Sequence, residues 1–209
     1  MIELPDGVRL VLASASPRRS ELLRSVGLEF EVIPADIDES VRPDETPAAY
    51  VARLSAEKAA VVAERVGSDV IVVAADTTVD VEGLILEKPV DADDARRMLR
   101  LLSGRIHLVH TAVTVLPSGQ SFGVGSAKTG ANETIVVETS VEFVELTPET
   151  EDWYVATGEP FGKAGSYAIQ GAGGALVRRL DGSVTNVIGL PLAETLVLIS
   201  ERAGLSLSR

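Results

Sequence analysis

The hydrophobic positions of this chain follow two periods, which predict buried strands and amphipathic helices. Continuous apolar runs at residues 8–13 and 69–75 are typical of strands that are buried on both faces. Apolar residues at helical spacing follow residues that suit a helix start, such as Thr46 before Pro47. We therefore expect helices over residues 17–26, 47–66, 92–102, 148–157 and 191–203. Further strands are expected over residues 29–33, 106–116, 133–146 and 176–180, with a hairpin over residues 79–87.

This order of strands and helices predicts a mixed α/β fold. The chain has no repeat and no linker-like stretch, so we expect one domain over residues 1–209. The Gly-rich stretch 123–132 is expected to be an excursion between two strands. Hydrophobic residues make up 45% of the chain but aromatic residues only 4%, so the core must be built mainly from aliphatic side chains.

Composition and charge exclude several classes of protein. The chain has no cysteine, which excludes disulfides, thiol catalysis and thiolate metal sites. Its formal net charge of −12 argues against binding of a nucleic-acid polymer, although local cations can still bind a small nucleotide. No apolar run is long enough for a transmembrane helix, and the first six residues do not resemble a signal peptide. We therefore expect a cytoplasmic protein.

The stretch of residues 14–19 is the strongest candidate for a binding site. It joins the first apolar strand to a helix that Ser16 can cap and that Pro17 can open. Free N–H groups at the start of a helix favour an anion, and Arg18 and Arg19 add two guanidinium groups. A phosphorylated ligand fits this junction, and so does a plain strand–helix junction with solvated arginines.

Charged and amide side chains elsewhere offer further groups for such a ligand. Asp76 follows the buried strand 69–75, at the kind of strand end where open α/β sheets place ligand chemistry, although it could equally cap a turn. Glu39 lies in an acidic segment that suits either a solvated loop or a metal-binding carboxylate. The other candidates are Lys88, Lys163, Gln170 and Asn186, whereas the helix position of Lys58 is typical of a surface lysine. Cations for phosphates, carboxylates for a metal and amides for a base edge together fit an enzyme that acts on a nucleoside triphosphate.

Other site patterns are not present in the sequence. Gly162 and Lys163 do not belong to a P-loop, because the preceding glycine is too close and Ala164 stands where a hydroxyl would bind magnesium. No G-x-G-x-x-G motif follows a strand, which disfavours a dinucleotide-binding fold. His107 and His110 are three residues apart on an expected strand, so they point to opposite faces and a shared metal site is not expected.

Six blocks of sequence carry a resemblance to a known family. The first is Ser14-Ala15-Ser16-Pro17-Arg18-Arg19, which is similar to the signature S-x-S-P-R-R. The others lie at residues 75–77, 87–91, 102–104, 163–171 and 186–191. Together they resemble, in the same order, the blocks of the Maf family of nucleoside triphosphate pyrophosphatases. They span nearly the whole chain, which makes the resemblance specific.

The resemblance implies a mixed α/β fold like that of inosine triphosphate pyrophosphatase. Such a fold has an elongated central sheet flanked by helices, with two lobes and a cleft between them. The resemblance also implies hydrolysis of a nucleoside triphosphate to the monophosphate and pyrophosphate, with a divalent cation, Mg²⁺ or Mn²⁺. It further implies a house-cleaning role on normal or modified pyrimidine nucleotides, and a homodimer.

Site residues follow from the resemblance position by position. Asp76 matches the family's proton acceptor, and Arg18, Thr77 and Gln170 match residues that set nucleotide choice. We expect catalytic roles for Asp76, Glu39, Lys58 and Lys88, and a metal at Asp76 and Glu39. Substrate binding is expected from Ser14, Arg18, Arg19, Thr77, Lys163 and Gln170.

The sequence also points to a branch of the family. Thr77 after Asp76, together with Gln170 between Ile169 and Gly171, resembles the branch that acts on dTTP and UTP. A glutamine amide can pair with O4 and N3–H of a pyrimidine. Gly162 departs from the family pattern, which often has an aspartate there. The alternatives are a 7-methyl-GTP pyrophosphatase, a nucleotidyltransferase, and a nucleotide-sensing regulator of cell division without significant turnover.

Overall fold

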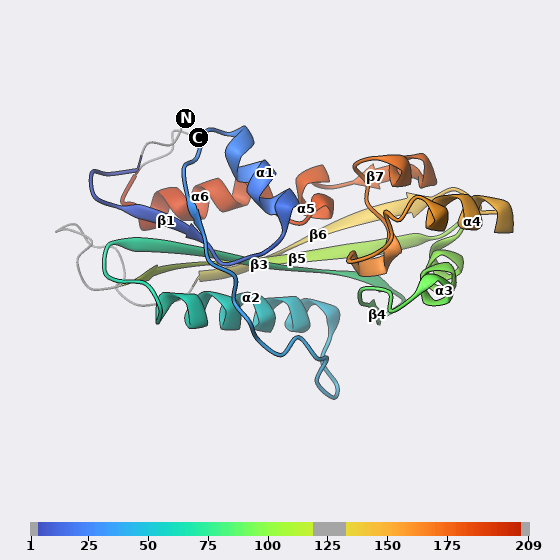
Figure 1. The fold of residues 1–209 in the computed structure, drawn as a ribbon, viewed down its shortest axis with the longest axis horizontal. Helices are drawn as coiled ribbons and strands as arrows, with labels where there is room; N and C mark the ends of the chain where they lie inside the picture. The colour runs from blue at the N-terminus through green and yellow to red at the C-terminus, as the bar shows by residue number, and fades with distance from the viewer. Residues whose placement is uncertain (1–3, 119–132, 206–209) are drawn as a thin grey trace.

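The computed structural model describes residues 4–118 and 133–205, which form a mixed β-sheet with helices on both faces (Figure 1). The strands are β1 (Arg9–Leu12), β2 (Glu31–Val32), β3 (Val70–Val81), β4 (Leu84–Leu86), β5 (Ile106–Ser118), β6 (Glu133–Phe143) and β7 (Val177–Asp181). The α-helices are α1 (Pro17–Ser25), α2 (Pro47–Ala63), α3 (Ala92–Leu102), α4 (Pro148–Ala156), α5 (Val184–Ile188) and α6 (Leu192–Arg202). Two 3₁₀ turns, η1 (Ala164–Ser166) and η2 (Ala172–Leu176), lie between α4 and β7.

The sheet is open and elongated because long strands run through its centre. The strand order is β2-β1-β3-β5-β6-β7, and β4 pairs with β3 beside that path. β3 and β5 pair antiparallel along residues 70–80 of β3, while β1 pairs parallel with β2 and β3. The mixed α/β fold with an elongated central sheet is therefore confirmed.

Helices cover both faces of this sheet. α2 lies on one face, α1, α5 and α6 lie on the other, and α3 and α4 lie toward the end of the sheet that carries β4 (Figure 1). α2 buries Val51, Leu54 and Val62 against the sheet, as its apolar spacing predicts. In the part of the chain that the structure describes, no helix combines the length and the apolar character that crossing a membrane requires.

The edge of β3 is free in the middle of the sheet. β1 pairs with residues 70–73, and β4 pairs with residues 79–81. β1 does not continue along β3 because the chain turns away after Leu12 and Pro17 opens α1. On this edge, no described strand pairs with residues 74–78 of β3. This gap in the sheet is the place where a ligand can reach the middle of β3.

The core has its two largest clusters on either side of that gap. One surrounds β1, α1 and α6 and includes Leu23 and Ile199. The other surrounds α3 and α4 and includes Leu99 and Phe143. β3 and β5 contribute to both clusters, so the sheet joins the two halves. These halves agree with the expected two lobes, and their folding as a single domain stays a prediction.

Some predicted elements differ from the structure. β2 contains only Glu31 and Val32, both exposed, instead of the expected strand over residues 29–33. α5 was not predicted, because its five residues are too few for a periodic apolar pattern. It is recognisable only from its cap, where the Ser183 side chain accepts a hydrogen bond from the N–H of Asn186. The expected excursion at residues 123–132 lies outside the described residues.

His107, on β5, is a buried histidine that should make stability depend on pH. Its Nε2 lies 2.9 Å from the phenol oxygen of Tyr167, and its ring packs edge-on against Phe143. Burial lowers the pKa of His107 from 6.5 to about 4, so between these pH values the unfolded chain binds a proton more readily than the folded chain. His107 therefore contributes stability that is present above pH 6.5 and is lost as the pH falls toward 4.

Urea unfolding at a series of pH values measures this contribution. Between about pH 7 and pH 4, the wild type is expected to lose about 3 kcal/mol more of its free energy of unfolding than the variant His107→Gln, which has no titrating ring. The same pH dependence in both proteins would show that His107 does not have this effect.

Candidate active site

A cavity of about 570 Å³ opens over the free edge of β3, between the ends of β1 and β4. The loop after β1, the segment before α2, α2 itself, β3, the segment after β4 and residues 162–170 all line it. All of the predicted site residues except Asn186 also line it: Ser14, Arg18, Arg19, Glu39, Lys58, Asp76, Thr77, Lys88, Lys163 and Gln170. The fold therefore gathers side chains that lie far apart in the sequence.

Arg19 is fixed by acceptors from three segments of the chain. Its Nε donates to the Gly189 carbonyl at 2.7 Å, one Nη to Ser14 Oγ at 3.0 Å and the other Nη to Thr77 Oγ1 at 3.0 Å. None of these acceptors is charged, and burial lowers the pKa of Arg19. A half-buried guanidinium among neutral acceptors favours an anion in the cavity that it lines.

The hydroxyl of Thr77 belongs to a directed chain of hydrogen bonds. Thr111 Oγ1 donates to the Asn186 carbonyl at 2.9 Å, so it must accept from Thr77 Oγ1, which lies 2.9 Å away. Thr77 in turn accepts from Arg19. The single proton of Thr77 is therefore used inside the protein, and its hydroxyl orients Arg19. Thr77 points to the face of the sheet opposite to Asp76, as neighbours on a strand do.

The loop between β1 and α1 differs in detail from the predicted cap. Ser16 precedes α1, but its side chain makes no capping hydrogen bond. Its N–H instead donates to Ser14 Oγ at 3.2 Å, which helps to hold the hydroxyl that binds Arg19. Arg18 makes only a longer contact, from its Nε to the Ile188 carbonyl at 3.3 Å. The guanidinium of Arg18 therefore keeps most of its donors for a ligand.

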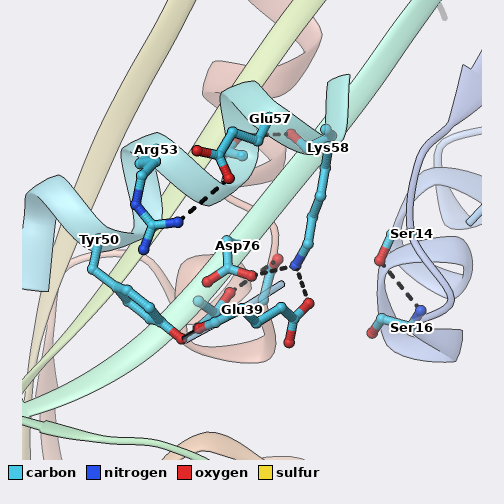
Figure 2. A network of polar contacts seen from close by, with 12 residues as sticks. Ser14, Ser16, Glu39, Tyr50, Arg53, Glu57, Lys58 and Asp76 are labelled. Atoms are coloured by element: carbon cyan, nitrogen blue, oxygen red, sulfur yellow. Dashed lines mark hydrogen bonds and ion pairs between the residues drawn. The ribbon is translucent and has the colours of Figure 1, made fainter. Parts of the chain in front are cut away.

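Lys58 joins the two predicted catalytic carboxylates (Figure 2). Its Nζ lies 2.7 Å from Asp76 Oδ1 and 2.5 Å from Glu39 Oε1. The other oxygen of Glu39, Oε2, lies 3.0 Å from Nζ of Lys88. Lys58 is buried rather than the surface lysine that its helix alone would suggest. The structure thus brings together Asp76, Glu39, Lys58 and Lys88 in a single ion-pair network.

The two carboxylates of this network differ in what they can do. Burial alone would raise the pKa of Glu39, but the hydrogen bonds and charges of Lys58 and Lys88 outweigh it and lower that pKa to about 2. Both Glu39 oxygens contact a lysine. Oδ2 of Asp76 has no hydrogen-bond partner among the residues that the structure describes. It is therefore the carboxylate oxygen that is available to a ligand or a water molecule.

A divalent cation fits this donor set when the substrate supplies further ligands. No group of three or more His, Asp or Glu side chains within residues 4–118 and 133–205 is arranged to hold a metal ion. Mg²⁺ commonly takes one or two protein carboxylates and completes its shell with phosphate oxygens and water. Through Oδ2, Asp76 would contact a water molecule in the shell of the cation, and Glu39 would bind the cation if one of its lysines turns to a phosphate.

The segment that carries Lys163 and Gln170 closes the other side of the cavity. Nζ of Lys163 donates to the carbonyl of Glu159 on the same segment. Gln170 is exposed, and its amide makes no hydrogen bond to the described residues, so it is available to a base. Gly162 has a φ of +72°, a conformation that favours glycine.

One prediction about the site is wrong. Asn186 does not read a base edge, because it is fully buried and its Nδ2 donates to the Val109 carbonyl and to Thr139 Oγ1. Sequence reasoning also missed Tyr50, whose side chain lines the cavity. The spacing of Tyr50 and Lys58, eight residues apart, places both on one helical face and could have identified it.

A comparison of the whole sequence with models of protein families shows to which family the chain belongs. A family model described as Maf-like protein matches residues 9–202. The chain belongs to the Maf family. The six blocks that resembled the family lie within the matched residues, and the resemblance is confirmed.

Curated relatives of this Maf chain are similar over nearly their whole length. A protein of Anaeromyxobacter dehalogenans (strain 2CP-1) named dTTP/UTP pyrophosphatase is 54% identical over 199 residues, which cover 95% of this chain and 96% of that protein. A protein of Syntrophus aciditrophicus with the same name is 44% identical over 200 residues, covering 96% and 93%. Among solved structures, the Staphylococcus aureus Ham1 protein has a TM-score of 0.43 at 14% identity, covering 65% of this chain and 71% of that one.

Proposed function

We propose that this Maf-family protein is a hydrolase that converts dTTP and UTP to the monophosphate and pyrophosphate. The observation that carries the proposal is one cavity that holds a half-buried Arg19, whose hydrogen-bond acceptors are all neutral, and a carboxylate, Asp76, with a free oxygen. The relatives named dTTP/UTP pyrophosphatase, at 44% and 54% identity, support the same substrates. Binding of a triphosphate next to a carboxylate with a free oxygen is what hydrolysis of a phosphoanhydride requires.

In the proposed reaction, Asp76 is the general base. Lys58 holds Oδ1 of Asp76, and Oδ2 accepts a proton from a water molecule. The water oxygen forms a bond to the α-phosphorus of the nucleotide. The bond from the α-phosphorus to the oxygen that bridges it to the β-phosphorus breaks, and pyrophosphate leaves with that oxygen and its electron pair.

Cations around the cavity bind the triphosphate in this proposal. Arg19 is held in place by its three acceptors, while Arg18 has most of its donors available. Lys88 and Lys163 contact protein acceptors that a phosphate oxygen can replace. Ser14 contributes by holding Arg19. Together these cations offset the charge that develops on the leaving pyrophosphate.

A divalent cation, Mg²⁺ or Mn²⁺, would be held by Glu39 and, through a water molecule, by Asp76, together with phosphate oxygens of the substrate. When bound, it would neutralise charge on the phosphates. Omission of metal in the presence of a chelator is therefore expected to abolish hydrolysis, and addition of Mg²⁺ or Mn²⁺ should restore it.

Gln170 is proposed to select the pyrimidine. Its free amide can pair with O4 and N3–H of uracil or thymine, as acceptor of one hydrogen bond and donor of the other. We expect Gln170→Ala to lower kcat/KM for dTTP and UTP by about 10–100-fold, as the loss of two hydrogen bonds implies. kcat/KM for ATP should change by less than this and serves as the control. An equal loss for all nucleotides would mean that Gln170 has no role in selection.

Pyrophosphate release from a panel of nucleotides tests the proposal. The panel contains dTTP, UTP, CTP, ATP, GTP, 7-methyl-GTP and modified pyrimidine triphosphates, each with Mg²⁺ and with Mn²⁺. The proposal predicts a clear preference for dTTP and UTP, with the free monophosphate as second product. A preference for 7-methyl-GTP would assign the protein to the branch of the family that acts on that nucleotide. Transfer of the nucleotide to an acceptor would indicate a nucleotidyltransferase. No release of pyrophosphate from any nucleotide would favour a nucleotide-sensing regulator.

The biological setting is also part of the proposal. We propose that the protein acts in the cytoplasm as a house-cleaning enzyme on normal or modified pyrimidine nucleotides, and that it forms a homodimer. Cell fractionation and light scattering of the purified protein test the location and the oligomeric state.

A further inference from the structure

Glu39 lies in an irregular segment, yet its carboxylate meets two lysines from two other parts of the chain. Residues 38–45, which we call the acidic loop, lie between β2 and α2 and contain no helix or strand. A loop without regular structure does not by itself hold a side chain in one place. What fixes Glu39 must therefore come from the groups that contact the backbone of the loop.

α2 supplies two of these groups, one helical turn apart. The phenol of Tyr50 donates to the Glu39 carbonyl at 2.9 Å, and an Nη of Arg53 donates to the Ser40 carbonyl at 3.0 Å. The Arg53 guanidinium also lies 5.7 Å from the centre of the Tyr50 ring. Two successive carbonyls of the acidic loop are therefore held by one face of α2, and Figure 2 shows Tyr50 beside Glu39.

Arg53 is itself held firmly at the far end of the acidic loop. Its Nε and an Nη pair with the two oxygens of Glu45 at 2.6 and 2.8 Å, and the Arg53 and Glu45 side chains are only 13% and 9% exposed. These hydrogen bonds outweigh the opposite effect of burial and lower the pKa of Glu45 to about 2. Such a two-point contact needs the planar fork of an arginine. Arg53 thus ties Ser40 and Glu45 to the same helix.

The loop also has a local turn beside Glu39. Oδ1 of Asp38 accepts from the N–H of Ser40 at 2.9 Å and from its hydroxyl at 2.6 Å. This turn encloses Glu39. With the turn and the two carbonyls fixed, the side chain of Glu39 extends toward Lys58, which lies on the same helix as Tyr50 and Arg53.

We infer that Arg53 and Tyr50 are positioning residues for the reaction, because they hold the backbone that places Glu39 between Lys58 and Lys88. The inference rests on the proposed function, in which Glu39 supports catalysis. Arg53 and Tyr50 act through Glu39. Their loss should therefore affect turnover only as far as Glu39 contributes to it.

A double-mutant cycle on turnover of dTTP tests this inference. Arg53→Ala and Tyr50→Phe are each expected to lower kcat by about 10–100-fold, because a small displacement of a catalytic group has effects of this size. In a Glu39→Gln background, either substitution should lower kcat further by less than about twofold. Arg42→Ala is the matched control, because the Arg42 side chain pairs with Glu57 as Arg53 does but holds no carbonyl of the loop. It should leave kcat within about twofold of the wild type.

Two results would overturn the inference. One is an equal fall in kcat with and without Glu39, which is what a general loss of structure produces. The other is a wild-type rate in both Arg53→Ala and Tyr50→Phe. If Arg53→Ala does not fold, Tyr50→Phe alone decides, since it removes only a hydroxyl.

A measurement without substrate separates this inference from the proposed function. Hydrogen–deuterium exchange of residues 37–46 should be faster in Arg53→Ala than in the wild type, whether or not the protein hydrolyses dTTP. Unchanged exchange would contradict the positioning contacts themselves. If exchange is faster in Arg53→Ala than in the wild type but the wild type does not hydrolyse dTTP, the result would contradict the proposed function instead.

Discussion

Asp76→Asn is expected to lower kcat for dTTP by about 10²–10⁴-fold, the range that a general base contributes. The asparagine oxygen can still accept the hydrogen bond from Lys58 that Oδ1 accepts at 2.7 Å, so the network should keep its shape. The amide cannot take a proton from water, so only the chemical step is lost. Steady-state kinetics of pyrophosphate release measure the change.

Binding should survive this substitution. Isothermal titration calorimetry with the α,β-methylene analogue of dTTP is expected to give a dissociation constant within about threefold of the wild type. Asp80→Asn is the control, because Asp80 lies four residues along the same strand but does not line the cavity. An Asp76→Asn variant that keeps more than a tenth of the wild-type kcat would remove Asp76 from the role of base.

Lys58→Met is expected to affect both stability and turnover. The methionine keeps the volume of the side chain but removes the cation that lies between Asp76 and Glu39. The two carboxylates then face each other, and the loss of one partner of a buried ion pair costs about 3 kcal/mol of the free energy of unfolding. For a chain of this size, the melting temperature should fall by about 6–12 °C. kcat should fall by about 10²-fold, because both carboxylates lose the group that orients them.

A divalent cation should partly reverse the loss of stability in Lys58→Met. Mg²⁺ can take the place of the ammonium between the carboxylates, so it should raise the melting temperature of this variant more than that of the wild type. Lys88→Met is the matched control, since Lys88 is 61% exposed and its ion pair with Glu39 should contribute less than about 1 kcal/mol. A wild-type melting temperature for Lys58→Met would mean that the network is not a source of stability.

The parts of the fold that depend on neighbouring residues could be predicted from the sequence. Thr46, Asp91 and Thr147 each begin a helix where expected, and their side chains accept from the backbone at 3.3, 2.8 and 3.3 Å. The buried runs that became β1 and β3 were identified by their continuous apolar character. These features need only a few neighbouring positions, so periodicity and caps identify them.

Features that depend on the pairing of distant segments could not be predicted. The free edge of β3 exists only because β1 and β4 pair with different parts of the same strand. The sequence made Asn186 a candidate ligand residue, and only the packing of α5 on the sheet shows that it is buried and that its Nδ2 donates inside the protein. The roles of the candidate site residues came from the resemblance to the Maf family, because the residues alone left other interpretations open, such as a turn cap for Asp76 and a solvated loop for Glu39.

Hydrolysis of dTTP in water enriched in ¹⁸O tests the central claim most directly. The account predicts that one ¹⁸O atom enters dTMP and none enters pyrophosphate, because water attacks the α-phosphorus and the bond from the α-phosphorus to the bridging oxygen breaks. Mass spectrometry of both products reads the result. Label in the pyrophosphate, or orthophosphate as the first product, would contradict it, since either outcome would place the attack on another phosphorus.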